Sequence, residues 1–543
     1  MLATRSPIVA SRDAPARSHS RTKRKPIHHA ARSGRWFGWI WIVPTLGDPV
    51  KLLGVVFSSV IFLFFFLPLV LAVGLPLQAL ANRRGGQGRV LGWANTWLLV
   101  ASVVFYAWGE VYLVWVMIAS CLLNYAGGYW CEPGRAGRRA ALIGVVTANL
   151  VLLAWFKYSG LAVEIANRGN AALGHLFGAD ITWVAVVLPL GISFYTFHGI
   201  SYVVDVWRAK ITPCRSLRDF LCYSTLFPQL VAGPIVRYSE VADQFVRRRV
   251  GREDLAEGAR RFIAGLGKKV LIANQVSVLA DAIFLLPESE RTAAAAWVGV
   301  TAYALQIFFD FSGYSDMAVG LGRMFGFRFP ENFDYPYSAG SMREFWRRWH
   351  MTLSRFFRDY LYIPLGGNRH GALRTALNLL AVFALCGLWH GASWNFVAWG
   401  LFHGLFLAAE RVLEPVTGRT PDWLRPAGHG YTIIAVLLSW VIFRCDTWAQ
   451  TMGYFRSMAG MTANGGLTAI PANVVTTGLL YAGAAGLLLC APLWPTLRHR
   501  CAQSAVGDRA LEATEVCVAL VVLFLCLISM GAGTHNPFIY YRF

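Results

Sequence analysis

Two neighbouring stretches decide how this sequence is interpreted: SMREFWRRWHMTLSRFFRDYLYIPLGGNRHG (residues 341–371) and LCGLWHGASWNFVAWGLFHG (residues 385–404). The first carries too many charges to cross a lipid bilayer, whereas the second is apolar and holds two histidines. Ser341 followed by Glu344 is typical of a capping box, which predicts that a helix begins there. Pro364 and the turn at residues 366–368 are predicted to end it.

On one continuous helix, the spacing of three arginines, a histidine and a serine places them on a common face. These residues are Arg343, Arg347, His350, Ser354 and Arg358. Two interpretations are open. The arginines could bind a phosphate-bearing acyl donor through bidentate contacts, or the helix could lie against anionic lipid headgroups. Among arginines, His350 is expected to lose its proton easily, and a general base must be neutral.

Apolar runs dominate the rest of the 543-residue chain, which is 56% hydrophobic and 15% charged with a mean hydropathy of +0.46. Since ~20 helical residues span a bilayer, we predict an all-α, polytopic integral membrane protein with about 11–13 transmembrane helices plus re-entrant or interfacial helices. The predicted spans are residues 57–80, 90–109, 111–130, 140–157, 180–204, 262–285, 294–322, 371–389, 394–412, 431–446, 476–496 and 513–531.

The net charge of +21 follows the topology of these spans. Alternate connections hold most of the Lys and Arg, whereas the loops 158–179, 286–293 and 447–475 carry one arginine each. This positive-inside pattern argues against a nucleic-acid footprint and predicts cytoplasmic basic loops in a multi-pass inner-membrane protein. The ten cysteines are scattered without metal-ligand spacing, so we expect neither disulfides nor a metal site.

Residues 1–53 break the charge pattern, because they are basic although the order of the spans would place them on the outer side of the membrane. They lack the order of a signal peptide. We interpret residues 1–53 as a basic N-terminal extension, either a disordered tail, an extra short membrane segment or an artefact of the chosen start codon. The membrane domain is predicted to be residues 54–543.

Polar and helix-breaking residues inside the apolar segments receive mostly structural interpretations. Span 180–204 should be kinked by Pro189 and Gly191, and His198 within it is expected to be a packing residue. The apolar run in residues 225–238 is too short to span and is expected to be re-entrant, with its backbone buried in protein.

Two carboxylates lie at membrane depth in residues 308–327. Asp310 and Asp316 should be paired or should line a polar cavity, with Arg323 the expected partner of Asp316. For Asp310, two interpretations are open: it could contact the substrate or the donor, or it could form a purely structural ion pair.

His390 is the sharpest candidate for catalysis, because an ionisable residue inside an apolar span is functional by default. It is flanked by Trp389 and followed by Trp394, both candidate substrate-binding residues, whereas His403 is expected to pack. We expect His390 at the outer end of its span, about 24 Å from Arg374 at ~1.5 Å per residue. No serine-nucleophile motif accompanies it, so a histidine base is the simpler chemistry.

Five motifs taken together resemble the membrane-bound O-acyltransferase (MBOAT) family, and the resemblance covers the chain from about Val56 to Phe543. The motifs are EFWRRWHMTLSRFFRDYLYIPLGGNRHG, LWHGASWNFVAWGLFHG, LFPQLVAGPIVRY, FFDFSGYSDMAVGLGRMFGF and PFIYYRF. Within the family, the similarity is greatest to members that O-acetylate alginate and smaller to members that transfer D-alanine. Family members often begin near VFSSVIFLFFFLPLVL, which places residues 1–53 outside the resemblance.

The resemblance implies that His390 is the family's invariant histidine and His350 its second active-site histidine. It also implies acetyl transfer from a cytoplasmic donor to hydroxyls of an exported polysaccharide. The donor would be a thioester such as acetyl-CoA or a carrier-protein-linked acyl group, with no bound cofactor. Periplasmic or membrane-anchored acetyltransferases would be partners. The alternatives are acyl or D-alanyl transfer to another envelope polymer, and a transporter or conduit, although the internal repeats typical of transporters are not evident.

Overall fold

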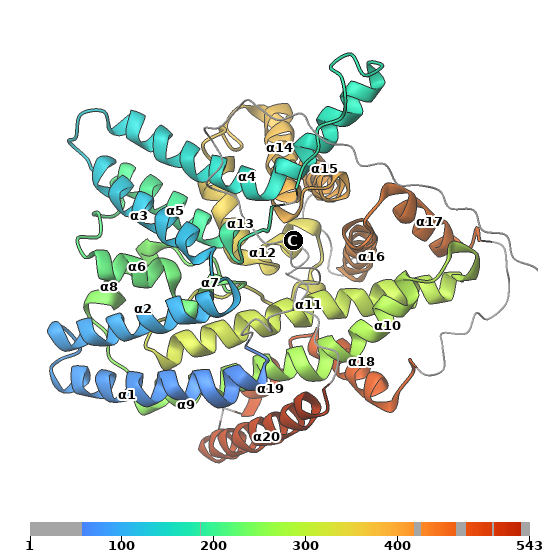
Figure 1. Ribbon diagram of the computed structural model, residues 1–543. Helices are drawn as coiled ribbons and strands as arrows, with labels where there is room; N and C mark the ends of the chain where they lie inside the picture. The colour runs from blue at the N-terminus through green and yellow to red at the C-terminus, as the bar shows by residue number, and fades with distance from the viewer. Residues whose placement is uncertain (1–56, 185, 418–424, 463–473, 502–503, 534–543) are drawn as a thin grey trace, which may run out of the picture. The chain divides into compact units, whose positions relative to one another are not determined.

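Helices form all the regular structure of the described residues in the computed structural model (Figure 1). The described residues are 57–184, 186–417, 425–462, 474–501 and 504–533. Within them the predicted all-α class is confirmed, since the only β pairing is an isolated bridge between Gln87 and Arg247. The predicted extension, residues 1–53, lies outside the described residues.

The first ten helices are α1 (Leu67–Arg83), α2 (Arg89–Gly109), α3 (Val114–Trp130), α4 (Arg138–Ala172), α5 (Ile192–Trp207), α6 (Leu217–Thr225), α7 (Phe227–Leu230), α8 (Tyr238–Val246), α9 (Arg252–Gly267) and α10 (Asn274–Phe284). The others are α11 (Ala293–Met324), α12 (Met342–Arg348), α13 (Met351–Phe357), α14 (Gly371–His390), α15 (Trp394–Thr417), α16 (Arg425–Arg444), α17 (Trp448–Met458), α18 (Thr477–Leu489), α19 (Leu493–Cys501) and α20 (Ala505–Gly531). Short π-helical segments are Phe62–Phe66, Lys268–Ala273 and Arg358–Tyr362, and short 3-10 turns are Glu288–Glu290 and Pro336–Ser338.

Each of the twelve predicted spans corresponds to a helix or helix pair. Among the described residues, nine helices are long and apolar enough to cross a membrane, and the pair α18–α19, bent by 64°, would make a tenth. The remaining two, α3 and α5, have 17 and 16 residues, which is short for the ~20 residues that a bilayer requires. The chain is therefore a multi-pass membrane protein.

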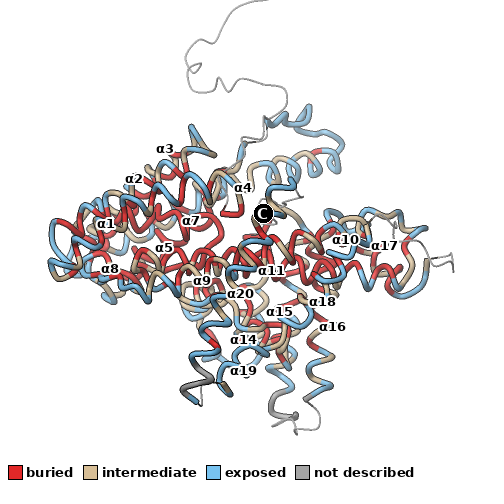
Figure 2. The backbone as a smooth tube through the Cα atoms, turned by 90° about the horizontal axis from the view of Figure 1, so that it is seen from below, coloured by how far each residue is buried: buried red, intermediate tan, exposed pale blue. Residues whose placement is uncertain are grey.

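Helix α11 is the most enclosed span: 78% of its most apolar window is buried, against 6% for α20 (Figure 2). Glycines let α9 approach it closely. A Cβ atom on Gly320 would lie 2.6 Å from the carbonyl oxygen of Gly258, and one on Gly313 would lie 2.7 Å from that of Gly265. Small residues at such crossings are how membrane helices gain packing contacts without a hydrophobic driving force.

The re-entrant prediction is confirmed in its essential point, burial. Between α6 and α8 the chain forms only the one-turn helix α7 and irregular backbone, and every residue from Leu226 to Val236 is buried. Irregular backbone at this position has its polar groups enclosed by protein, as the absence of water in a bilayer requires.

Two boundaries in the preceding region were predicted wrongly. Helix α4 continues through the predicted loop 158–179 as far as Ala172. In the predicted kinked span 180–204, the described residues before Leu190 have no regular secondary structure, and α5 begins only at Ile192, after Gly191 with φ 71°. A carbonyl oxygen lies 2.5 Å from where a Cβ on Gly191 would be, so this turn needs glycine.

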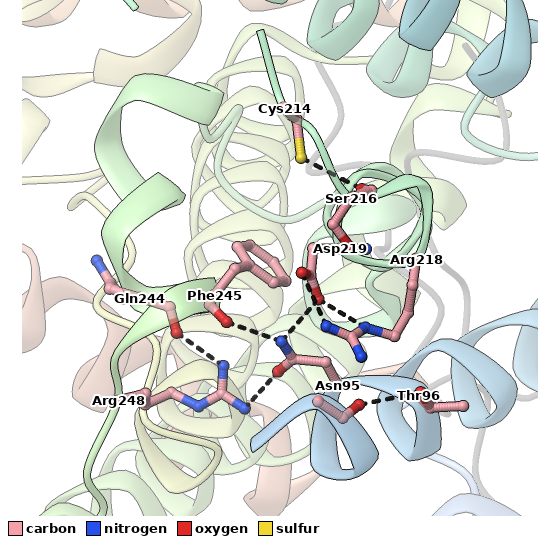
Figure 3. Close-up of polar contacts among 10 residues, drawn as sticks. Asn95, Thr96, Cys214, Ser216, Arg218, Asp219, Gln244, Phe245 and Arg248 are labelled. Carbon is pink, nitrogen blue, oxygen red and sulfur yellow. Dashed lines mark hydrogen bonds and ion pairs between the residues drawn. The ribbon is translucent and has the colours of Figure 1, made fainter. Parts of the chain in front are cut away.

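A buried polar network ties helices α6 and α8, and Arg248 directly after α8, to helix α2 (Figure 3). The Asn95 amide donates to Asp219 and to the Phe245 carbonyl, both at 2.9 Å, and accepts from Arg248 at 2.9 Å. Arg218 donates to Asp219 at 2.9 Å. Each charge is thereby paired or hydrogen-bonded, as burial demands.

Helices α14, α15 and α16 are seen nearly end-on in Figure 1, whereas α11 lies in the plane of the view. These helices therefore run steeply across α11. The expected distance of about 24 Å between His390 and Arg374 is measured along α14. Because α14 crosses α11 steeply, this distance does not give the position of His390 along the direction of α11.

Candidate active site

His390 is the last residue of α14, and close helix packing sets its place. A Cβ atom on Gly387 would lie 2.1 Å from the Phe396 carbonyl oxygen, and one on Gly400 would lie 2.0 Å from that of Phe383. The two glycines thus bring α14 against α15. Gly391 then leaves the helix in extended conformation and packs on the Phe396 ring, so these glycines serve the close approach of a neighbouring helix.

Aromatic rings enclose most of His390, and 7% of its surface stays accessible. Its ring centroid lies 4.7 Å from that of Trp389, 5.0 Å from Trp399 and 5.3 Å from Phe443. The indole N–H groups of Trp389 and Trp399 are buried and have no hydrogen-bond partner among the described residues. Two unsatisfied donors therefore flank the imidazole.

Helix α4 holds the end of α14 through two side chains that the sequence did not single out. Lys157 donates to the carbonyl of Trp389, and the Tyr158 hydroxyl donates to that of Leu388 at 3.0 Å. They satisfy carbonyls of the last helical turn, which have no partner within α14. Both residues fall where the sequence placed the end of a span and a loop, so no periodic signal marked them.

His350 breaks the helix that the sequence predicted to be continuous. Ser341 caps α12 by accepting from the Glu344 N–H, as expected, but the chain leaves the helix at Trp349 and takes the left-handed region at His350, with φ 42° and ψ 54°. The ring is 1% exposed, and its Nδ1 lies 3.0 Å from Asn332 Oδ1. Burial lowers the pKa of His350 to about 3, so the imidazole is neutral at physiological pH.

The two histidines converge on one indole. The Trp389 ring centroid lies 6.3 Å from that of His350 and 4.7 Å from that of His390. His403 is fully buried and accepts from the Trp346 indole at 3.2 Å, in keeping with the packing role expected for it.

The predicted arginine face does not exist, because the break at His350 separates its members. Arg343 is half-buried at the start of α12, where its N–H donates to Glu410 at 3.0 Å, and Arg347 is exposed. Arg358 begins the π-helical turn and pairs with Asp359 at 2.6 Å. The prediction of one continuous helix that carries all three arginines is thus wrong, and a phosphate site formed by them stays a prediction.

A different basic cluster forms around Tyr360, and the sequence analysis missed it. The guanidinium groups of Arg208 and Arg237 lie over the Tyr360 ring, 5.5 and 5.0 Å from its centroid. Arg237 also donates to the Asp359 carboxylate at 2.8 Å, whereas its Nη2 is buried without a hydrogen-bond partner among the described residues. Arg208 lies in a connection predicted to be a basic cytoplasmic loop and Arg237 in the segment predicted to be re-entrant, so only the fold brings them together.

A row of aromatic rings connects this cluster with the histidine pair. Tyr360 lies 4.9 Å from Phe356, which stacks on Phe197 at 4.1 Å, and Phe197 stacks on Trp389 at 5.4 Å. The row therefore runs from a charged, partly exposed surface to the indole that both histidines share.

The intramembrane carboxylates are engaged in ion pairs. Asp310 pairs with Lys269 at 2.6 Å, and both side chains are almost completely buried. Asp316 pairs with Lys268 and Arg261, not with Arg323 as predicted, because α9 and the π-helical segment that follows it, rather than the end of α11, supply the paired cations.

Two further sites complete the comparison with the sequence. Arg323 pairs with Asp254 and Glu257 of α9. Trp394, a predicted substrate contact, is 62% exposed at the start of α15.

Comparison with known proteins identifies the family. Residues 214–450 match the model of the membrane-bound O-acyltransferase family. The chain is 38% identical to the probable alginate O-acetylase AlgI of Pseudomonas putida, over 90% of this chain and 100% of the relative. It is 44% identical to the probable alginate O-acetylase AlgI of Azotobacter vinelandii, over 72% and 75%, and 32% identical to the peptidoglycan O-acetyltransferase of Helicobacter pylori, over 90% and 97%.

A helical membrane protein with two histidines converging in an aromatic-lined site, matched over its length by acyltransferases, is itself a membrane acyltransferase. The chain belongs to the membrane-bound O-acyltransferase family.

Proposed function

We propose that this protein transfers an acetyl group from a cytoplasmic thioester to hydroxyls of an alginate-type exopolysaccharide in the inner membrane. The observation that carries the proposal is that His350 and His390 both lie in ring contact with Trp389. The similarity to alginate O-acetylases over the relative's whole length supports the choice of acetyl group and polymer.

In the proposed reaction, neutral His390 accepts the proton of the acceptor hydroxyl while the oxygen attacks the thioester carbonyl carbon. The tetrahedral intermediate collapses by breaking the C–S bond, and the thiolate leaves with the proton returned by His390. His350 orients the acceptor or shares the proton. General-base help of this kind is worth ~10²–10⁴-fold in rate.

The unsatisfied indole donors of Trp389 and Trp399 suit the oxyanion that develops on the carbonyl oxygen. Buried donors aimed at developing charge contribute most to catalysis when water is excluded, and the aromatic surroundings of His390 provide that exclusion.

The donor is proposed to be acetyl-CoA or a carrier-linked acyl group, and the cluster around Tyr360 suits its phosphates. Guanidinium groups bind phosphate through charge-assisted contacts, and Arg237 has an unengaged Nη2. The aromatic row then offers an apolar path along which a pantetheine arm could reach Trp389. Periplasmic or membrane-anchored acetyltransferases are the proposed partners on the opposite side.

A second candidate acceptor is peptidoglycan, favoured by the similarity to the Helicobacter pylori enzyme over 97% of its length. To separate the two, the chain is expressed in an alginate-producing host from which the native alginate O-acetylase gene has been removed. Ester-linked acetyl is then measured on alginate and on isolated peptidoglycan. Restored alginate acetylation supports the proposal; acetyl on peptidoglycan alone would transfer the assignment to the second candidate.

A further inference from the structure

Asn332 lies in the connection between α11 and α12 and is buried, with 1% of its surface exposed. Its side-chain oxygen Oδ1 has three neighbours: His350 Nδ1 at 3.0 Å, the Thr352 hydroxyl at 2.9 Å and the Thr352 backbone nitrogen at 3.3 Å. The identity of these neighbours determines which nitrogen of His350 carries the proton.

The orientation of the Asn332 amide follows from Thr352. A backbone N–H can only donate, so the atom that faces it must be the amide oxygen and not the NH₂ group. The Thr352 hydroxyl already accepts from the Ile235 N–H at 3.0 Å, which leaves its own proton to point at Asn332. Both contacts therefore require an acceptor at this position.

Since Oδ1 can only accept, His350 Nδ1 must be the donor of the third contact. A neutral imidazole carries one proton on its two nitrogens, so the lone pair that can accept a proton is then on Nε2. We infer that Asn332 is a positioning residue that fixes His350 as the Nδ1–H tautomer and so leaves Nε2 as its proton-accepting nitrogen. The inference deepens the proposed function and rests on it.

The same segment also fixes where the ring points. Met351 N–H donates to the Asn332 carbonyl and Asp334 N–H donates to the Arg348 carbonyl, each at 2.9 Å. These two bonds hold the chain on both sides of His350 in its left-handed conformation, which a non-glycine residue keeps only when its surroundings impose it. Through Thr352 the arrangement is anchored to Ile235 in the buried segment that follows α7.

The direct test is the tautomer of His350 in the full-length protein. Membranes containing ¹⁵N- and ¹³C-histidine-labelled protein are examined by solid-state NMR, and the His350→Gln variant assigns the His350 signals by their loss. The expected result is a proton on Nδ1 in the wild-type protein and a shift toward the Nε2–H tautomer in Asn332→Leu. A wild-type His350 protonated on Nε2 overturns the inference, whatever the activity of the protein.

Kinetics provide the second readout, with transfer of radiolabelled acetyl from acetyl-CoA to polymer measured in inside-out vesicles. Asn332→Leu should lower kcat by about 10²-fold, as loss of a correctly oriented base does, and leave KM for acetyl-CoA within about twofold. Asn332→Asp, which keeps an acceptor oxygen, should retain the proton on Nδ1 and recover part of the rate.

Ser338→Ala is the matched control, because Ser338 accepts from Arg348 in the same connection at 3.2 Å and makes no contact with His350. It should leave both the tautomer and kcat unchanged. Wild-type kcat and an unchanged tautomer in Asn332→Leu would refute the positioning role alone. Full transfer by His350→Gln would instead refute the role of His350 in the proposed reaction, while the tautomer measurement would still stand.

Discussion

The buried ion pair between Asp310 and Lys269 allows the sharpest stability prediction. The two side chains are 2% and 3% exposed, and a carboxylate oxygen lies 2.6 Å from the ammonium nitrogen. Asp310→Asn removes the negative charge and leaves the positive charge of Lys269 enclosed in the protein. The structure thus makes Asp310 a structural partner of Lys269, so its replacement should act on folding first.

The magnitude follows from burial. Removing one member of a buried ion pair costs about 3–5 kcal/mol, because the remaining charge is left uncompensated, whereas replacing both by apolar residues is often neutral. At ~1.4 kcal/mol per factor of ten, Asp310→Asn should reduce the ratio of folded to unfolded protein by ~10²–10⁴-fold. The double variant Asp310→Leu/Lys269→Met should recover most of this loss.

Buried free thiols provide the assay. Cys386, Cys445 and Cys526 are buried and unpaired, so a thiol-reactive fluorogenic dye reports unfolding of detergent-solubilised protein on heating. The expected order of melting temperature is wild type, then the double variant, then Asp310→Asn well below both. Wild-type stability of Asp310→Asn would refute the argument from burial. A stable double variant without acetyl transfer would show that Asp310 contacts a substrate after all.

Four further outcomes are expected. Gly387→Val adds a Cβ 2.1 Å from a carbonyl oxygen of α15 together with two methyl groups, so the abundance of the variant in the membrane should fall severely; normal abundance would mean that the helices can separate. Lys157→Met removes the donor to the Trp389 carbonyl and should lower kcat about tenfold at normal abundance; an unchanged kcat would deny it any role in placing the end of α14. Arg237→Gln should raise KM for acetyl-CoA by ~10-fold or more, since charge-assisted bonds are worth ~1.5–3 kcal/mol, and an unaltered KM would remove the donor from this cluster. Burial raises the pKa of Asp359, but hydrogen bonds from two arginines outweigh it and keep the pKa below its usual value. The ion pairs of Asp359 with these arginines are present above the unfolded pKa of ~3.9 and are lost only as pH falls through the lowered value. KM for acetyl-CoA should therefore stay constant from pH 7 to about pH 5, and a rise within that range would contradict the pairing.

The spans, the buried re-entrant segment and the two histidines could be predicted because each rests on a local signal. Apolar length identifies a membrane helix, prolines in a short apolar run indicate irregular backbone, and a histidine such as His390 in an apolar span is rare enough to stand out. Each of these signals is contained in a few consecutive residues.

The break at His350 could not be predicted, because its cause lies elsewhere in the chain. The residues around it have helical spacing, and the left-handed conformation is imposed by hydrogen bonds to Asn332 and Asp334 in the preceding connection. Periodicity alone therefore placed three arginines on a face that tertiary contacts divide.

The cluster around Tyr360 was missed for a related reason. Arg208 and Arg237 are far from Tyr360 in sequence, and basic residues in cytoplasmic loops are already explained by topology. The lysine partners of Asp310 and Asp316 were also missed, although the sequence carried a signal for them. Lys268 and Lys269 interrupt an apolar span, and cations at such positions need carboxylates nearby.

The central claim is that His390 is the general base, and the most direct measurement is acetyl transfer by His390→Ala at matched protein abundance. Transfer from acetyl-CoA to polymer in membrane vesicles is compared with wild type and with His429→Ala, whose ring contacts the Ala339 carbonyl and not the histidine pair. We predict that kcat falls by ~10²–10⁴-fold in His390→Ala, with KM for the donor unchanged and with His429→Ala fully active. Transfer by His390→Ala at the wild-type rate would contradict the claim.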